Sequence, residues 1–363
     1  MSDDITRRTA VKALGAGLLA GGSVPFFHVQ SYGQNQATKV SLTLPFTIHG
    51  SYTGFIVARE LGYWRDRGVE VEVSRGYGAL DVIKKLLLGR FNYGDSSFES
   101  VIQAAASEGL DAVGIGLHMQ VSPLAIFTLN KSGIKQPKDL EGKVLGAAPM
   151  YGDWLFFPAF AKKTGIDRSK ITVRFLDGSV RAQTLLNGGV DALTGYYNLD
   201  APMLWTAGGD IHIMLYHTYG LKMYGTGLLA VRTQIEKFPE VTKAVVEGVM
   251  EGYKYTYLNP AQALDMHIAN MSELQGHRAR DITKYQMLLN TALGVHPASK
   301  EHGLGYYIPE EVAQNVALAT EFLSLQKHVD PSKVFTNNFV GTVKLTPAEW
   351  DKVEQSVKPY ILR

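Results

Sequence analysis

The sequence predicts an α/β fold made of two similar βαβ lobes that are joined by two crossing segments. One order of elements, strand, helix, strand, helix and strand, occurs twice along the chain of 363 residues. Each copy has Gly-rich or aromatic loops before its helices, so each should form a small parallel sheet covered by helices. Ligands of such sheets bind beyond the carboxyl ends of the strands. Two lobes of this kind therefore predict one shared cleft.

The two copies of the repeat define the expected strands and helices. The first copy consists of Lys39–Phe46, Tyr52–Arg67, Val69–Ser74, Ala79–Leu88 and a strand within Gly89–Asp95. The second copy consists of Lys143–Ala148, Asp153–Thr164, Ile171–Leu176, Val180–Leu186 and a strand within Gly188–Thr194.

Two later segments are expected to cross between the lobes and form a hinge. His118–Asn130 is rich in β-branched and apolar residues and should be a strand that leaves lobe 1, and Thr226–Arg232 should be the strand that returns. This places lobe 1 in residues 38–130 and 227–363, and lobe 2 in residues 131–226.

The part of the chain after the second crossing is mostly helical in pattern. Val241–Leu258 predicts a long helix that ends at Asn259-Pro260. Ile308-Pro309 predicts another helix start, because proline suits the first helical turn. We expect Ala261 to Tyr360 to pack back on lobe 1, which makes that lobe discontinuous in sequence.

Composition excludes several classes of function. The formal charge is +2 and no basic stripe is present, so nucleic acid is not an expected partner. The chain has no cysteine, which excludes disulfides, thiolate metal sites, a cysteine nucleophile and a lipid-modified N-terminal cysteine. His267, Glu273 and His277 lack the i, i+4 pairing that would bring them to one ion, so no metal is expected.

Residues 1–37 are typical of an export signal and leader. Thr6–Lys12 contains paired arginines and precedes the apolar run Ala13–Phe27. The arginine pair resembles a twin-arginine signal, and an ordinary Sec signal is the alternative. The run is shorter than the roughly 20 residues that a membrane-spanning helix needs and is broken by Pro25. We therefore expect a cleaved signal and a mature protein free in the periplasm.

Several segments, in their order and spacing, point to a known family. They are Gly54–Trp64, Val69–Val73, Gly89–Asp95, Asp139–Lys143, Gly188–Ala192 and Val334–Phe339. Together they resemble the periplasmic solute-binding proteins of the nitrate, sulfonate and thiamine-pyrimidine class, over nearly the whole mature chain. The resemblance implies a type II periplasmic-binding-protein fold that closes on a small solute and delivers it to an ABC permease in the inner membrane. We expect no cofactor.

Loops that follow strands hold the candidate ligand-binding residues. Most of these loops open a helix, whose unpaired N–H groups can bind an anion or a carbonyl oxygen. The candidates are Thr47, His49, Ser51, Tyr52, Gly76, Tyr77, Gly78, Asp95, Ser96, Ser97, Tyr151, Gly152, Trp154, Asp177, Tyr196, Tyr197, Asn198 and Tyr224.

Some of these candidates also have a purely structural interpretation. Gly76 and Gly78 allow a tight turn without any ligand, and the two serines after Asp95 suit helix N-caps. Asp95 itself could orient a polar ligand or bond its own loop backbone. A lone histidine such as His49 is more often packed or solvent-facing than functional.

The aromatic residues of the loops favour a planar polar ligand. Three or four tyrosine or tryptophan rings in the cleft would make walls suited to stacking a flat ring. Arg75 and Arg181 lie next to two of the loops and could pair with a carboxylate, sulfonate or phosphate group, so an acidic ligand stays an alternative. We therefore expect a small heteroaromatic or aromatic solute, with or without an acidic group, such as a thiamine pyrimidine precursor. An alkylsulfonate- or nitrate-type anion is the alternative.

Two further classes of function stay open. A pyrimidine-precursor synthase resembles lobe 1, but the positions of its lysine and histidine fall on Asp95 and Glu99 here, so we expect no catalytic residue and no enzyme activity. A sensory partner of a membrane receptor would bind a solute in the same way as a transporter subunit. We expect a monomer in either case.

The export signal leads to a first prediction. The precursor should be cut between Phe27 and Ala37, because the apolar run is a processing segment and the repeat begins only at Lys39. Intact-mass measurement of the protein from a periplasmic extract tests this. A full-length product retained in the membrane would contradict it.

Overall fold

The structure, a computed structural model, describes residues 37–107, 111–149, 151–271 and 276–362. These residues belong to one compact unit, Gln36–Arg363. The expected export signal in residues 1–37 lies outside the described residues, apart from its last position. Across the described ranges, no helix combines the length and the apolar character needed to cross a membrane.

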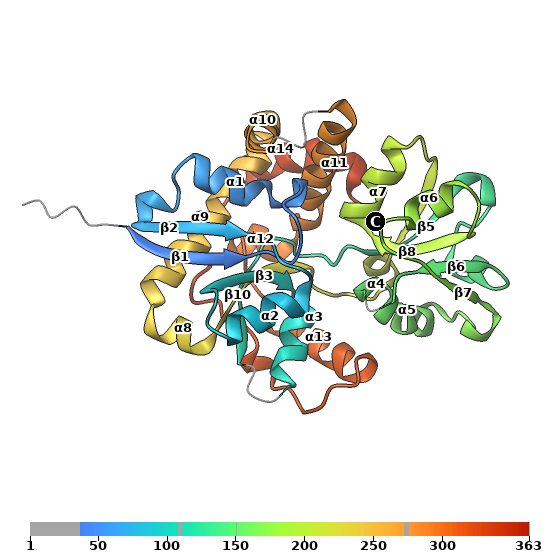
Figure 1. Cartoon of the computed structure of the whole chain (residues 1–363), viewed down its shortest axis with the longest axis horizontal. Helices are drawn as coiled ribbons and strands as arrows, with labels where there is room; N and C mark the ends of the chain where they lie inside the picture. Colours follow the sequence, from blue (N-terminus) through green and yellow to red (C-terminus); the bar gives the residue numbers. More distant parts are fainter. Residues whose placement is uncertain (1–36, 108–110, 150, 272–275, 363) are drawn as a thin grey trace, which may run out of the picture. The chain divides into compact units, whose positions relative to one another are not determined.

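The first sheet has five strands in the order β2-β1-β3-β10-β4 (Figure 1). The strands are β1 (Thr38–Thr43), β2 (Val69–Ser74), β3 (Tyr93–Ser97), β4 (Ala112–Leu117) and β10 (Thr226–Val231). Strand β1 pairs in parallel with β2 and β3, whereas β10 is antiparallel to β3 and β4. The first copy of the repeat thus forms the parallel part of this sheet.

The second sheet repeats this plan in the order β7-β6-β8-β5-β9. Its strands are β5 (Leu124–Leu129), β6 (Val144–Ala147), β7 (Thr172–Phe175), β8 (Ala192–Tyr196) and β9 (Ile211–Leu215). Strand β6 is parallel to β7 and β8, and β5 is antiparallel to β8 and β9. The expected α/β class with two βαβ lobes is confirmed. Lobe 1 below means the first sheet with its helices, and lobe 2 the second.

Helices cover both faces of each sheet. On the first sheet, α1 (Thr53–Glu60) and α9 (Pro239–Leu258) cover one face, and α2 (Ala79–Leu87), α3 (Phe98–Ala105) and α13 (Pro309–Phe322) cover the other. On the second sheet, α5 (Phe157–Thr164) covers one face, and α6 (Arg181–Leu186) and α7 (Tyr197–Thr206) cover the other. The remaining α-helices are α4 (Gly152–Leu155), α8 (Arg232–Lys237), α10 (Pro260–Ala269), α11 (His277–Gly294), α12 (Pro297–His302) and α14 (Pro347–Val357).

The central strands are apolar on both sides because both faces of the sheets are buried. Along β10, Leu228 and Ala230 join the core under α1 and α9, whereas Leu229 points to the core under α2 and α3. This alternation is what a strand with helices on both sides requires.

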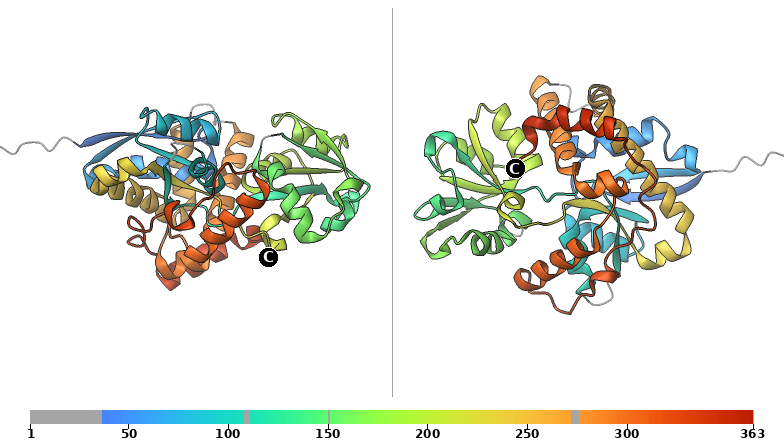
Figure 2. Two further views of the ribbon diagram at one scale, coloured as in Figure 1. Left: turned by 90° about the horizontal axis from the view of Figure 1, so that it is seen from below. Right: turned by 180° about the vertical axis from the view of Figure 1, so that it is seen from behind.

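Strand β5 belongs to the second sheet, so the boundary between the lobes comes before residue 130, where it was expected. The pattern predicted one strand over His118–Asn130, but β4 ends at Leu117 and β5 begins only at Leu124. Between them, the N–H groups of Val121 and Ser122 bond to carbonyls outside any strand. Pro123 has no N–H to offer to a ladder. Sheet membership therefore divides the lobes near residue 123, and Figure 2 shows both connections between them from behind.

The first helix of the repeat is shorter than expected. The prediction was one helix over Tyr52–Arg67, whereas α1 ends at Glu60 and a short 3-10 turn follows at Arg65–Arg67. Gly62 has a φ of 75°, in the left-handed region that ends helices. The helix ends because the backbone at Gly62 leaves the right-handed helical conformation.

Helix α11 contacts both lobes, so the C-terminal part does not pack on lobe 1 alone. Its Leu289 and Leu293 belong to the core of lobe 2 under α7. Its Gln286 accepts a hydrogen bond from the N–H of Gly50 in lobe 1, at 2.9 Å. Near the C-terminus, the carbonyl of Tyr360 accepts a hydrogen bond from the hydroxyl of Tyr197 in α7, at 2.9 Å.

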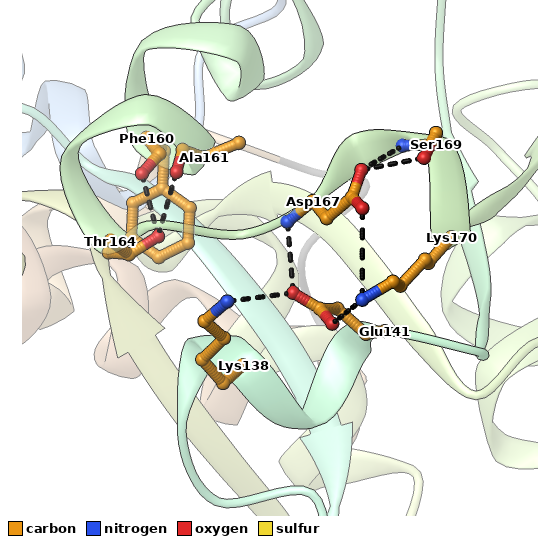
Figure 3. A network of polar contacts seen from close by, with 8 residues as sticks. All are labelled: Lys138, Glu141, Phe160, Ala161, Thr164, Asp167, Ser169 and Lys170. Carbon is orange, nitrogen blue, oxygen red and sulfur yellow. Dashed lines mark hydrogen bonds and ion pairs between the residues drawn. The ribbon is translucent and has the colours of Figure 1, made fainter.

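A polar network fixes the entry into the second sheet (Figure 3). The Glu141 carboxylate accepts hydrogen bonds from the Asp167 N–H at 2.9 Å and from the amines of Lys138 at 3.0 Å and Lys170 at 3.1 Å. These bonds, the Asp167 N–H first, lower the pKa of Glu141 to about 2. The Asp139–Lys143 segment, which carries part of the family resemblance, thus has a structural role in joining two loops of lobe 2.

Candidate functional site

A cavity of about 390 Å³ lies between the loops of the two sheets. Lobe 1 contributes the loops after β1, β2 and β3, and lobe 2 contributes the loops after β6 and β8. The two crossing segments also line it, through residues such as His118, Ser122 and Thr226. The cavity therefore lies at the carboxyl ends of the parallel strands, where ligands of open α/β sheets bind.

Twelve of the eighteen candidate residues line this cavity. They are His49, Ser51, Tyr52, Tyr77, Gly78, Ser96, Ser97, Tyr151, Gly152, Tyr196, Asn198 and Tyr224. They come from both lobes and from the returning crossing segment, and their binding of a solute stays a prediction.

Three other candidates are packed behind the cavity. Asp95 is fully buried and bonds to His118 instead of facing the cavity. Trp154 stacks on Phe157 in the core of lobe 2, with a centroid distance of 5.6 Å. Tyr197 is buried against the C-terminal segment through its hydroxyl. Each lies next to a cavity loop in sequence, but its side chain turns toward a core.

The last three candidates have structural or surface positions. Thr47 is exposed and does not line the cavity. A Cβ on Gly76 would lie 2.3 Å from the carbonyl oxygen of Leu44, so only glycine fits against that backbone. Asp177 is exposed, and its carboxylate accepts hydrogen bonds from the backbone and side chain of Ser179 in its own loop.

The loop after β1 joins the two lobes directly. Ser51 in the 3-10 helix η1 (Gly50–Tyr52) accepts a hydrogen bond on Oγ from the side-chain amide of Asn198 in α7, at 3.0 Å. His49 accepts the Ser51 N–H on Nδ1 at 3.3 Å. Burial, with smaller effects from His267 and His118, lowers the pKa of His49 to about 3. His49 is therefore neutral at pH 7, with the proton on Nε2 available to a ligand acceptor.

A buried His118–Asp95 pair supports the inner wall of the cavity. His118 Nε2 and Asp95 Oδ2 are 2.8 Å apart, and the imidazole stacks on Tyr253 at 4.7 Å. Burial raises the pKa of Asp95, and the histidine offsets part of that rise. The pair links β3 to the first crossing segment, and through it Asp95 holds a cavity-lining residue in place.

Glu99 in the first turn of α3 brings a carboxylate to the boundary between the lobes. A Cβ on Gly152 would lie 3.2 Å from Glu99 Oε1 and 3.3 Å from the Tyr196 hydroxyl. Glycine at this position therefore lets a lobe 1 carboxylate approach the backbone of lobe 2. Burial raises the pKa of Glu99, and hydrogen bonds from Ser97 and from its own N–H oppose that rise.

A buried ion cluster lies behind the tyrosine wall of lobe 2. The Arg181 guanidinium donates to both oxygens of Asp200, at 2.9 and 2.6 Å, and lies 3.4 Å from Asp153 Oδ2. Its Cζ is 5.7 Å from the ring centre of Tyr151 and 5.8 Å from that of Tyr196. Asp200 also accepts the Tyr196 N–H at 2.7 Å. The cluster therefore holds the two rings by cation–π contacts and a backbone bond.

The charges on the cavity wall are acidic. Among the described residues that line the cavity, none is lysine or arginine, whereas Asp81 and Glu99 are present. Arg75 and Arg181, the two arginines considered as partners of an acidic ligand, do not line the cavity. Arg75 lies 4.8 Å from the ring centre of Tyr77, and Arg181 is bound to aspartates. Within the described ranges, no group of three or more His, Asp or Glu residues could hold a metal ion.

Glu99, Gln103 and His118 line the cavity and are not among the residues predicted from the sequence to face the ligand. Glu99 and Gln103 are four residues apart on α3, so they share a face, and that helix starts at a cavity loop. The first helical turn after a cavity loop is thus a signal for such residues. His118 carried no such signal, because its place depends on where β4 ends.

Residues 50–263, more than half of the chain, match the protein family described as NMT1/THI5 like. The chain belongs to this family. The predicted membership in the nitrate, sulfonate and thiamine-pyrimidine class is thereby confirmed.

Curated relatives of this NMT1/THI5-like protein are distant. A formylaminopyrimidine-binding protein of Halalkalibacterium halodurans is 24% identical over 237 residues, which cover 64% of this chain and 71% of the relative. A 4-amino-5-hydroxymethyl-2-methylpyrimidine phosphate synthase of Legionella pneumophila is 22% identical over 234 residues, 63% of this chain and 72% of that protein.

Solved structures show the same fold at low identity. The periplasmic aliphatic sulphonate binding protein SsuA of Escherichia coli has a TM-score of 0.64 and 18% identity, covering 85% of this chain and 94% of that one. A putative sulfonate ABC transporter, periplasmic sulfonate-binding protein SsuA of Methylobacillus flagellatus has a TM-score of 0.61 and 15% identity, covering 89% and 96%. The expected periplasmic-binding-protein fold is confirmed by these likenesses.

The Arg181 cluster predicts a large effect of one substitution. Arg181→Met leaves Asp153 and Asp200 buried without their cation, so the free energy of unfolding at pH 7.5 should fall by about 3–5 kcal/mol. Urea unfolding measures this, with the exposed Arg168→Met as the control.

The loss of unfolding free energy caused by Arg181→Met should be smaller at pH 5 than at pH 7.5. Burial raises the pKa of Asp153 to about 6 and also raises that of Asp200. A carboxyl with a raised pKa in the folded state adds stability at low pH and loses it as the pH rises through that pKa. Equal losses for Arg181→Met and Arg168→Met, or a loss independent of pH, would contradict this account.

Proposed function

We propose that this protein is the exported, periplasmic solute-binding component of an ABC importer and that it binds a small planar heteroaromatic solute in the interlobe cavity. A thiamine pyrimidine precursor is the solute that fits best. The solute would be released to a permease in the inner membrane, and the protein would act as a monomer without chemical conversion of the solute.

The aromatic wall of the cavity carries this proposal. Phe46, Tyr52 and Tyr77 come from lobe 1, and Tyr151, Phe156 and Tyr196 come from lobe 2. Tyr77 is 77% exposed and Tyr151 is 38% exposed, so both side chains keep accessible surface. A flat ring gains most from such surfaces, because stacking adds to the burial of apolar area. The formylaminopyrimidine-binding relative supports the same ligand class.

The residues of the cavity wall favour a sulfonate or nitrate ligand less than a planar ring. The structural neighbours named for sulfonate binding share the fold at 18% identity or less. An anion in a water-poor site needs converging donors or a cation. The described cavity wall offers two carboxylates and no lysine or arginine.

A transport role is proposed over a catalytic one. The relative from Legionella pneumophila is named a synthase. In this chain, Asp95 stands where the synthase lysine is expected and is bound to His118, and no cysteine is available as a nucleophile. A sensory role would use the same cavity, and the genes next to this one would distinguish it: a permease and ATPase favour transport, a sensor kinase favours sensing.

A thermal-shift screen of the mature protein tests the ligand class. Pyrimidines, flavins and aromatic acids should include a compound that raises the melting temperature, since a ligand that binds only the folded state stabilises it. Alkylsulfonates and nitrate should give smaller shifts. A strong response to those anions with none from any ring compound would overturn the proposed ligand class.

Substitution of the exposed rings tests the site. Tyr77→Ala and Tyr151→Ala should each weaken binding of the best ring compound by about 1 kcal/mol or more, the range of a lost aromatic contact and its burial. Phe238→Ala removes an exposed aromatic outside the cavity and should leave affinity unchanged. Isothermal titration calorimetry gives the three affinities. Unchanged affinity in both tyrosine variants would place the ring elsewhere.

A further inference from the structure

Glu99 is a half-buried carboxylate on the cavity wall for which the described residues provide no lysine or arginine partner. The other cavity-lining carboxylate, Asp81, lies 2.6 Å from the amine of Lys85 and accepts the Tyr77 N–H at 3.0 Å. Asp95 does not line the cavity, and its Oδ2 is paired with His118. Among the described residues that line the cavity, Glu99 is thus the acid whose charge is left for a solute.

The surroundings of Glu99 hold its carboxylate in place without neutralising it. Ser97 occupies the N-cap position of α3 but makes no capping hydrogen bond with its side chain. Its hydroxyl bonds to Glu99 instead, together with the N–H of Glu99 itself. Across the lobe boundary, Gly152 leaves room for Oε1, and the Tyr196 hydroxyl next to it accepts the Gly152 N–H at 3.0 Å.

We propose that Glu99 is the specificity-determining residue of the cavity and that the solute carries an N–H donor group, such as a ring amino group or an amidine, which pairs with this carboxylate. The inference rests on the proposed binding of a planar ring and adds the chemical group that the ring must carry. Because Glu99 comes from lobe 1 and its oxygen lies beside Gly152 of lobe 2, the donor group binds where the lobes meet.

The pairing follows from the cost of leaving a buried charge alone. Removing a carboxylate from water is unfavourable unless donors replace the water. Burial already raises the pKa of Glu99, which is the sign of that cost in the unliganded protein. A donor-bearing solute removes the cost, whereas an oxo group or an anion at the same place would face the carboxylate with another acceptor and be rejected.

The test compares two probes that differ in one group. The probes are 4-amino-5-hydroxymethyl-2-methylpyrimidine and its 4-methoxy counterpart, which has no N–H donor, titrated by calorimetry into wild-type protein, Glu99→Gln and Glu236→Gln. The last variant removes the same charge from an exposed position in α8, outside the cavity. Glu99→Asp is a second variant that keeps the charge and shortens its reach.

Wild type and Glu236→Gln should bind the amino probe at least 10-fold more tightly than the methoxy probe. Glu99→Gln should lose about 10- to 100-fold for the amino probe, the range of a hydrogen bond to a charged group, and little or nothing for the methoxy probe. Its melting temperature without ligand should equal or exceed that of the wild type, because an uncompensated buried charge has been removed. Loss of affinity with no loss of stability separates recognition from a structural role.

Three results would overturn the inference. Equal affinity for both probes in wild type, with no change in Glu99→Gln, would reject Glu99 as the determinant while ring binding stands. Binding of alkylsulfonates and of no ring compound would reject the proposed ligand class and the inference together. If Glu99→Gln does not fold, Glu99→Asp decides: an unchanged preference for the amino probe together with an unchanged affinity contradicts the inference, and a reduced preference supports it.

Discussion

The site depends on two antiparallel strands, β10 in the first sheet and β5 in the second. Each of these strands begins where an antiparallel neighbour ends: Leu124 pairs with Tyr196 at the end of β8, and Thr226 pairs with Ser97 at the end of β3. Both crossing segments must therefore reach the sheets at the edges that carry the cavity loops. As a result, the connections between the lobes form part of the cavity wall, and a solute bound there touches the segments about which the lobes would move.

The fold was largely predictable from sequence, because its information is local and repeated. The strand–loop–helix order, written twice, was enough to expect two sheets and a cavity at their carboxyl edges. The position of β5 was not predictable in this way, since an apolar segment such as Leu124–Leu129 fits either sheet and only its partners decide. The contacts of α11 with both lobes likewise depend on packing between residues far apart in the chain.

The candidate site was predictable as a set of loops and less so as a set of side chains. Tyr151 and Trp154 are three residues apart, yet the first lines the cavity and the second stacks in the core of lobe 2. Tyr151 precedes α4 as its N-cap residue in an extended conformation, whereas Trp154 lies within the helix. Arg181 next to a loop suggested an anion partner, and the structure supplies that partner internally as Asp200. A charged side chain next to a loop therefore does not by itself indicate the charge of the cavity wall, since its pairing is set by tertiary contacts.

We propose that both lobes bind one solute and that binding brings them together. Small-angle X-ray scattering of the mature protein, with and without the tightest ring compound, tests this most directly. The radius of gyration should decrease when the solute is bound, because neither lobe alone can remove it from water. A solute that calorimetry shows to bind tightly while the radius of gyration stays the same would contradict the account.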